Sequence, residues 1–156
     1  MADTAVTIAR ADTSQLSLQE QSRGFSNKFH VDYPDVAFGS GNADTVTMTL
    51  GALPSNFVLN NALVNITTAF AGTTAFSVNV GTTSSTSALV TAQSVKTAGV
   101  LAGVPTNVTI VKGTASVSLV ATFTNSGGGG SPSALTAGAL DIYLNIVDLS
   151  DPTKLG

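Results

Sequence analysis

Apolar and polar side chains alternate at every second position in several stretches of this chain. Between Thr45 and Leu50, for example, Val46, Met48 and Leu50 alternate with threonines. Alternation of this kind turns one face of an extended strand toward a core and the other toward solvent. The pattern predicts about eight strands, a number typical of a double-sheet fold. The predicted strands are Lys28–Tyr33, Thr45–Leu50, Phe57–Thr68, Ala75–Val80, Ala88–Val95, Asn107–Ile110, Ser116–Thr124 and Leu140–Ile146.

Glycine, proline, serine and asparagine gather between these stretches, where they favour turns. No helical pattern of about ten residues separates the strands, so a parallel sheet built from strand–helix–strand units is not expected. We therefore predict an all-β fold, an antiparallel β-sandwich of jelly-roll-like type. The predicted turns are Gly39–Asn42, Leu53–Asn56, Ala71–Thr73, Gly81–Ser87, Gly103–Pro105 and Ser126–Ser133.

Residues 1–24 differ from the rest of the chain because they gather charged side chains and show no strand alternation after Ile8. Ser17 and Glu20 stand at the spacing of a capping box. Two interpretations stay open, a frayed terminus or an arm that becomes ordered on a neighbouring subunit. We divide the chain into an N-terminal arm (1–24), a β-sandwich domain (25–150) and a C-terminal tail (151–156). The expected partner-binding residues are apolar anchors and cations of the first segment and of its border with the sandwich domain: Arg10, Leu16, Leu18, Arg23 and Phe25.

Charged side chains are scarce in the middle of the chain. From Thr45 to Leu140 they are limited to Lys96 and Lys112, and the whole chain is 10% charged, against about 25% in an average soluble domain. Such a surface is solvated by hydroxyls and amides or covered by other subunits, so we expect self-association. A net charge of −3 and scattered basic residues argue against nucleic-acid binding.

Few residues offer catalytic or metal-binding chemistry. The single histidine, His30, precedes Asp32 by two positions, and a metal site there would need a further ligand such as Asp35 or Asp44. An ordinary solvent-facing histidine is the favoured interpretation. Asp141 and the carboxylates that follow it can approach this region in a sandwich, but a glycosidase needs a cleft that is usually lined with aromatics, and the chain has no tryptophan.

The remaining catalytic patterns are also missing from the sequence. There is no cysteine and no Gly-x-Ser-x-Gly motif, so we predict no catalytic residue, no metal and no cofactor, and we expect that the protein is not an enzyme. The N-terminal residues lack the basic start and apolar run of a secretory signal, and nowhere do about 18 apolar residues follow one another. We expect a soluble protein that is made in the cytoplasm and does not bind membranes.

Four segments resemble small β-sandwich virion proteins of tailed bacteriophages. They are a strand after a Leu-Pro pair (Ala52–Leu59), the strand and turn VNITTAFAGT (Val64–Thr73), the strand end VNVG (Val78–Gly81) and the last strand LTAGALDIYL (Leu135–Leu144). The resemblance covers roughly residues 45–148 and leaves out the arm and the glycine-rich loop. It implies a jelly-roll-like capsid decoration or cement protein that assembles as a homotrimer on the capsid exterior and binds the major capsid protein. It implies no catalytic residue.

These observations leave hypotheses of different classes open. The favoured one is a structural virion protein, made in the host cytoplasm, that ties capsid subunits together and gains avidity from repeated sites. The alternative is a tail or fibre-associated sandwich that recognises a host-surface glycan. Glycan sites usually need aromatic platforms, which are scarce here. An enzyme of carbohydrate or acyl chemistry has the least support.

Overall fold

Two stacked β-sheets make up the described part of the chain. The computed structural model describes residues 5–6, 26–37, 45–53, 56–103, 110–112, 117–126 and 132–148. The first sheet, here called sheet A, has the strand order β1-β3-β9-β5-β6. Its strands are β1 (Ala5–Val6), β3 (Thr45–Ala52), β9 (Ser118–Asn125), β5 (Phe76–Thr82) and β6 (Ser85–Ser94).

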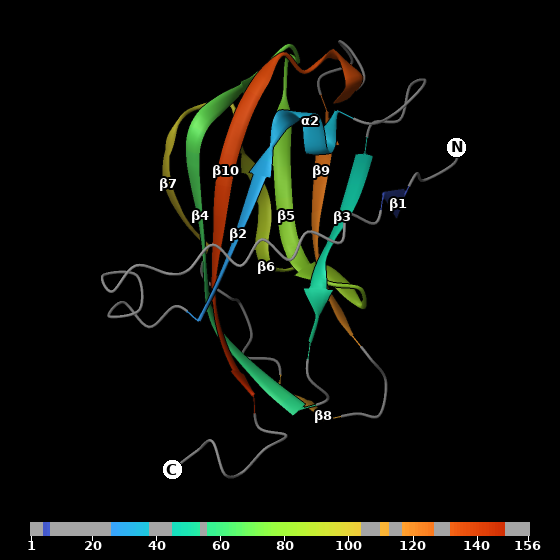
Figure 1. Cartoon of the computed structure of the whole chain (residues 1–156), viewed down its shortest axis with the longest axis vertical. Coiled ribbons are helices and arrows are strands. Elements are labelled where there is room, and N and C mark those ends of the chain that lie inside the picture. Colours follow the sequence, from blue (N-terminus) through green and yellow to red (C-terminus); the bar gives the residue numbers. More distant parts are fainter. Residues whose placement is uncertain are drawn as a thin grey trace.

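The second sheet, sheet B, is built around two long strands. β4 (Asn56–Ala71) and β10 (Ala137–Asp148) pair in antiparallel fashion along most of their length. The other side of β10 carries β2 (Asn27–Asp32), and successive parts of β4 pair with β7 (Gly99–Gly103) and β8 (Ile110–Lys112). In Figure 1, β7, β4, β10 and β2 follow one another from the left, and β9 and β3 lie to the right.

The strand pairs are nested along the chain. β2 pairs with β10, β3 with β9, β4 with β7 and β5 with β6. In chain order, the first of these eight strands therefore pairs with the last, the second with the second last, and so on inward. The two orders β2-β10-β4-β7 and β3-β9-β5-β6 result, one in each sheet. The chain is therefore an all-β sandwich, as the sequence predicts.

The alternation in the sequence decides which side chains enter the core between the sheets. Val46 and Met48 of β3 are buried while the threonines between them are not, and β5 alternates in the same way. Three aromatic rings lie at the centre: the ring centroids of Phe70, Phe76 and Phe123 are 5.6 to 6.1 Å apart. Aromatic pairs at such distances contribute beyond their buried area, by about 0.5–1.5 kcal/mol each.

A short helix replaces the predicted end of the first strand. The alternation extended that strand to Tyr33, but β2 ends at Asp32 and the helix α2 (Tyr33–Val36) follows. Pro34 suits the first turn of a helix because it has no N–H to leave unpaired. In addition, the Asp32 backbone N–H donates to the Asp35 carboxylate over 3.1 Å. These local features outweigh the strand propensity of tyrosine.

Two further elements differ from the sequence prediction. β7 was not predicted, because it has only five residues, of which the first and the last are glycines, and these are too few to show alternation. The predicted loop Gly81–Ser87 is reduced to a turn at positions 83–84, since β5 continues to Thr82 and β6 begins at Ser85. The Thr82 hydroxyl accepts a hydrogen bond from the Ser85 N–H over 3.2 Å, which closes this turn.

One strand lies inside the predicted N-terminal arm. Ala5 and Val6 of β1 pair in parallel with Thr47 and Met48 of β3. The predicted turns at Gly39–Asn42 and the glycine run at 127–130 lie outside the described residues, as do both predicted domain boundaries near 25 and 150. The last described strand ends at Asp148.

Candidate functional site

The predicted partner-binding residues lie outside the part of the chain that the structure describes. This applies to Arg10, Leu16, Leu18, Arg23 and Phe25. Asp44, one of the further ligands considered for a metal site at His30, also lies outside it. The described residues that carry chemistry are found on the outer faces of the two sheets and at one end of the core.

A polar cluster lies on the outer face of sheet B, where β2 and β10 pair. His30 stands opposite Asp141 in the antiparallel register. Its Nδ1 atom is 2.6 Å from Asp141 Oδ1, and its Nε2 atom is 3.1 Å from Asp32 Oδ1. A neutral imidazole has a single N–H, so two such contacts to carboxylates fit the doubly protonated ring. The pairing of β2 with β10 thus brings together carboxylates that the sequence leaves far apart.

The carboxylates on either side stabilise the charged form of His30. The hydrogen bond with Asp141 is the main cause that raises the pKa of His30 above its ordinary value of 6.5; partial burial opposes it, and the charge of Asp32 adds to it. The Asp141 side chain is 9% exposed and that of Asp32 is 46% exposed. The contact with Asp141 is therefore the better shielded of the two.

Lys28 and Tyr143 complete the cluster, and the sequence prediction did not include them. Lys28 Nζ lies 3.4 Å from Asp141 Oδ2 and 5.3 Å from the centroid of the Tyr143 ring. The Tyr143 hydroxyl lies 3.4 Å from the same Asp141 oxygen. Partial burial lowers the pKa of Lys28, but contacts with Tyr143 and Asp141 outweigh it and leave the pKa raised. The alternation placed Lys28 beside His30 on one strand face, which was the available signal.

This cluster is arranged as an ion-pair network. Within the described residues, no three histidine, cysteine or carboxylate side chains are grouped so as to hold a metal ion. Both nitrogens of the one histidine already contact carboxylates. No helix among the described elements is long and apolar enough to span a membrane.

Charge is divided unevenly between the two sheets. The strands of sheet A contain no Asp, Glu, Lys, Arg or His. The strands of sheet B contain all the charged or titratable strand residues of the described chain: Lys28, His30, Asp32, Lys112, Asp141 and Asp148, with Tyr143 among them. In the described structure, sheet A is therefore uncharged and sheet B carries the charged strand residues.

The outer side of sheet A is a surface of hydroxyl and amide groups, here called the hydroxyl face. It consists of Thr45, Thr47, Thr49, Ser77, Asn79, Ser118, Thr122 and Thr124, with the apolar Val120 among them, and Val120 and Thr122 are buried. The register aligns them in rows across three strands: Thr47 stands opposite Thr122, which stands opposite Asn79. The hydroxyls of Thr47 and Thr122 are 3.3 Å apart. The three strands that form this face all come from the part of the sequence in which charged residues are scarce.

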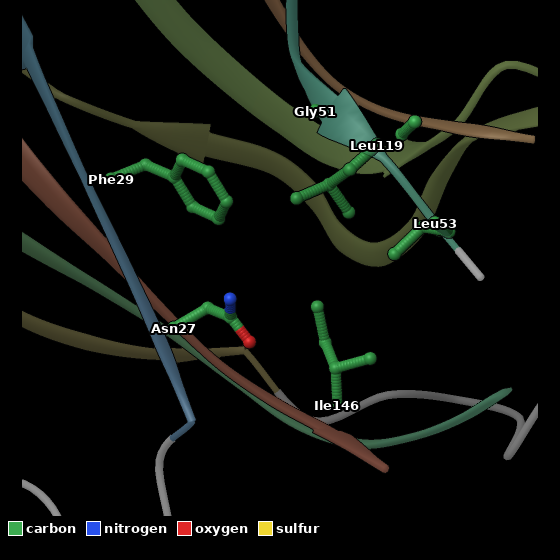
Figure 2. A pocket seen from close by; sticks show the side chains of 7 residues that line it. Asn27, Phe29, Gly51, Leu53, Leu119 and Ile146 are labelled. Atoms are coloured by element: carbon green, nitrogen blue, oxygen red, sulfur yellow. The ribbon is translucent and has the colours of Figure 1, made fainter. Parts of the chain in front are cut away.

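A small pocket opens between the sheets at one end of the sandwich. It has a volume of about 230 Å³ and is lined by Asn27, Phe29, Gly51, Ala52, Leu53, Leu119 and Ile146. Figure 2 shows Phe29, Leu119 and Ile146 directed toward a common space, with the Asn27 amide at one side. Small-molecule sites usually measure about 300–1,000 Å³ and combine several polar groups, so this pocket lacks the features of a cofactor site.

Comparison with known proteins finds no matching family model, no matching curated protein and no matching solved structure. The resemblance to phage decoration proteins rests on the four sequence segments described above and stays a prediction.

Proposed function

We propose that this protein is a structural virion protein that binds the outer surface of a phage capsid and stabilises it, as a decoration or cement protein. The observation that carries the proposal is the division of charge between the sheets: sheet A has no charged side chain, whereas sheet B carries the ion-pair network. An uncharged face can be covered by a partner without burying unpaired ions, which is costly. We assign the hydroxyl face to the shell and sheet B to solvent.

The strand order supports the finer fold assignment that this proposal includes. In a jelly roll, eight strands form two packed sheets through two Greek keys, an architecture frequent in viral capsid proteins. The nested pairs described above follow this pattern when β7 and β8 together count as one strand. The jelly-roll-like fold, the homotrimer and the major capsid protein as partner therefore belong to one proposal, with the predicted arm as a second contact to the shell.

The glycan-binding alternative gains no support from the polar cluster. The aromatic ring in that cluster belongs to Tyr143, which is 8% exposed and lies beneath Lys28. A sugar stacks on an accessible ring face, and this ring does not provide one. The structural role is therefore the one that the described residues favour.

Capsids that lack the protein provide the test. The purified protein, mixed with such capsids and sedimented, should bind at a fixed and saturable copy number. Binding to host cells or glycans without binding to capsids would instead favour the alternative function.

A pair of matched variants tests the assigned face. Thr47→Glu places a charge on the hydroxyl face, and Thr67→Glu places the same charge on the exposed outer side of β4 in sheet B. We expect Thr47→Glu to weaken capsid binding at least about tenfold, because tenfold corresponds to only about 1.4 kcal/mol, and Thr67→Glu to leave it unchanged. Equal effects of the two variants would reject the hydroxyl face as the contact surface.

A further inference from the structure

We propose that His30 is a pH-operated clasp: as an imidazolium it holds the edge strand β2 on β10, and as a neutral ring it gives up one of its two carboxylate contacts. This inference does not depend on capsid binding. It concerns how firmly the sandwich holds the strand that continues directly from the N-terminal segment.

The position of β2 makes it sensitive to such a contact. β2 is the edge strand of sheet B, and in the described structure its strand partner is β10 alone. At its beginning, the Ser26 backbone N–H donates to the Leu144 carbonyl over 2.8 Å, and the Ser26 hydroxyl accepts from the Ile146 N–H over 2.7 Å. On its outer face, β2 contacts β10 through His30 and Asp141, through Lys28 and the same carboxylate, and through Lys28 over the Tyr143 ring.

The geometry defines which contact is lost. With both ring nitrogens protonated, His30 donates to Asp141 through Nδ1 and to Asp32 through Nε2. After loss of one proton, the single N–H can serve one carboxylate, and the lone pair of the other nitrogen then faces negative charge. The Nδ1 contact is shorter and better shielded, at 2.6 Å against 3.1 Å. The remaining proton therefore stays on Nδ1, and the contact with Asp32, on the same strand, is given up. The contact with Asp141 across the strands loses its charge assistance, because a neutral N–H is a weaker donor to a carboxylate than an imidazolium N–H, and this weakens the hold of β10 on β2.

The carboxylates near His30 favour its charged form, whereas the Lys28 ammonium, which shares Asp141 with it, opposes that form. Lys28 on β2 and Tyr143 on β10 contact Asp141, and Asp35 of α2 accepts from the Asp32 backbone N–H. Asn65, opposite Asp141 on β4, is uncharged. With the imidazolium, the groups Lys28, His30, Asp32 and Asp141 carry no net charge; with neutral His30 they carry one net negative charge. After His30 loses its proton, Lys28 still pairs with Asp141. The loss of the proton therefore loosens β2 without unfolding the sandwich.

The sign of the pH dependence follows from the raised pKa of His30. A histidine whose pKa is higher in the folded state contributes stability that is fully present below the unfolded value of about 6.5 and is lost as the pH rises through the folded value. Each unit by which the pKa of His30 falls when β2 opens corresponds to about tenfold in the protection of β2. The clasp is thus closed at mildly acidic pH and open at alkaline pH.

Nuclear magnetic resonance of the full chain tests the clasp directly, because the chain has a single histidine and its ring signals need no assignment. We expect a titration midpoint above 6.5 and ring nitrogen shifts of the Nδ1–H tautomer at high pH. Asp141→Asn should lower the midpoint more than Asp32→Asn, since Asp141 is the main cause of the raised pKa. A wild-type midpoint at or below 6.5 overturns the proposal.

Hydrogen exchange of the backbone amides tests the consequence for β2. After correction for intrinsic exchange, the amides of β2 should lose protection as the pH rises through the His30 midpoint, while those of β5 should not. His30→Gln should abolish this pH dependence. If His30→Gln does not fold, the exposed Asp32→Asn substitution, which removes only the weaker contact, should shift the loss of protection to lower pH. A β2 profile that is the same in wild type and variant overturns the proposal.

Discussion

The Nδ1 atom of His30 lies 2.6 Å from Oδ1 of Asp141, although 111 positions separate the two residues in the chain. The contact exists because the first long strand of the sandwich pairs with the last, with His30 and Asp141 opposite each other in the register. It lies on the charged sheet, on the side of the molecule that we assign to solvent. The pairing of β2 with β10 therefore creates the ion-pair network that is seen among the described residues.

Removal of the charge of Asp141 should destabilise the fold more than removal of the charge of Asp32. Asp141 is 7% exposed and contacts Lys28, His30 and Tyr143. Hydrogen bonds to charged groups contribute about 1.5–3 kcal/mol, so Asp141→Asn should lower the free energy of unfolding by about 1–3 kcal/mol. Replacement of the exposed Asp32 by Asn should lower the free energy of unfolding by less than about 1 kcal/mol. Urea unfolding at about pH 5.5 measures both variants.

The pH dependence of this difference has a defined sign. The contribution of His30 is present below its unfolded pKa of about 6.5 and disappears above its raised folded pKa. The gap between wild type and Asp141→Asn should therefore be smaller at about pH 9 than at about pH 5.5. A gap that grows with pH would contradict the assignment of His30 as a cation in the folded protein.

Gly138 should tolerate alanine less well than Gly99 does. The two glycines have nearly the same backbone angle, φ of 148° and 147°, which L side chains rarely adopt. A Cβ atom at Gly138 would overlap the ring of Phe70, whereas one at Gly99 meets nothing within 4 Å. Both substitutions should lose stability through the backbone, and Gly138→Ala should lose a further 1–3 kcal/mol, approximately the cost of overpacking. Equal melting temperatures of the two variants would contradict the close packing at Phe70.

Core and outer-face positions of the strands should respond differently to alanine. Ile142 is fully buried between Phe29 and Val64 of the neighbouring strands, so Ile142→Ala should cost about 2–5 kcal/mol. Thr47 lies on the hydroxyl face, and Thr47→Ala should cost under about 1 kcal/mol. Equal losses in chemical denaturation would mean that the faces of β3 or β10 are assigned incorrectly.

The sequence predicts which face of a strand is buried but not which strands are neighbours. Val46 and Met48 are identified as core residues by alternation alone, because the period of a strand is two residues. The contact between His30 and Asp141 depends on strand order, which alternation does not encode. The end of β2 was missed because Pro34 and Asp35 favour a helical turn over the strand propensity of Tyr33. The prediction from alternation therefore fails where local turn chemistry or strand order determines the structure.

The candidate site was predictable in part. The threonines of Thr45–Leu50 and the scarcity of charge are properties of the sequence, and both reappear in the hydroxyl face. Their union with Ser77, Asn79 and Thr122 into one surface results from the order β3-β9-β5. Periodicity within a single strand carries no information about strand order. The hydroxyl face could therefore not be predicted from the sequence and is seen only once the sheet is known.

Self-association is a direct expectation from the surface composition. We predict a homotrimer, because the stretch from Thr45 to Leu140 has few charged side chains that would oppose association and because the resemblance to decoration proteins implies threefold assembly. Light scattering coupled to size exclusion should give three times the mass of one chain at micromolar concentration. The mass of a single chain under these conditions would contradict the prediction.

Deletion of residues 1–23 should separate folding from capsid binding. Within the described structure, the deleted segment contributes only the two paired residues Ala5 and Val6 of β1. The melting temperature should therefore fall by no more than about 2–4 °C, which corresponds to about 1 kcal/mol for a chain of this size. Capsid cosedimentation should fall much more, since the segment contains most of the predicted apolar anchors and cations, among them Arg10 and Arg23.

Substitutions within the full-length chain provide the matched control for this deletion. Replacement of Leu16 and Leu18 by serine removes two apolar anchors and leaves the paired residues Ala5 and Val6 in the chain, so binding should fall without any change in melting. The measured loss will be smaller than the contacts alone suggest, because a segment that becomes ordered on binding loses conformational entropy. Unchanged binding of the deletion variant would reject the docking arm and leave the hydroxyl face as the contact with the shell. Failure of that variant to fold would instead make residues 1–23 part of the sandwich.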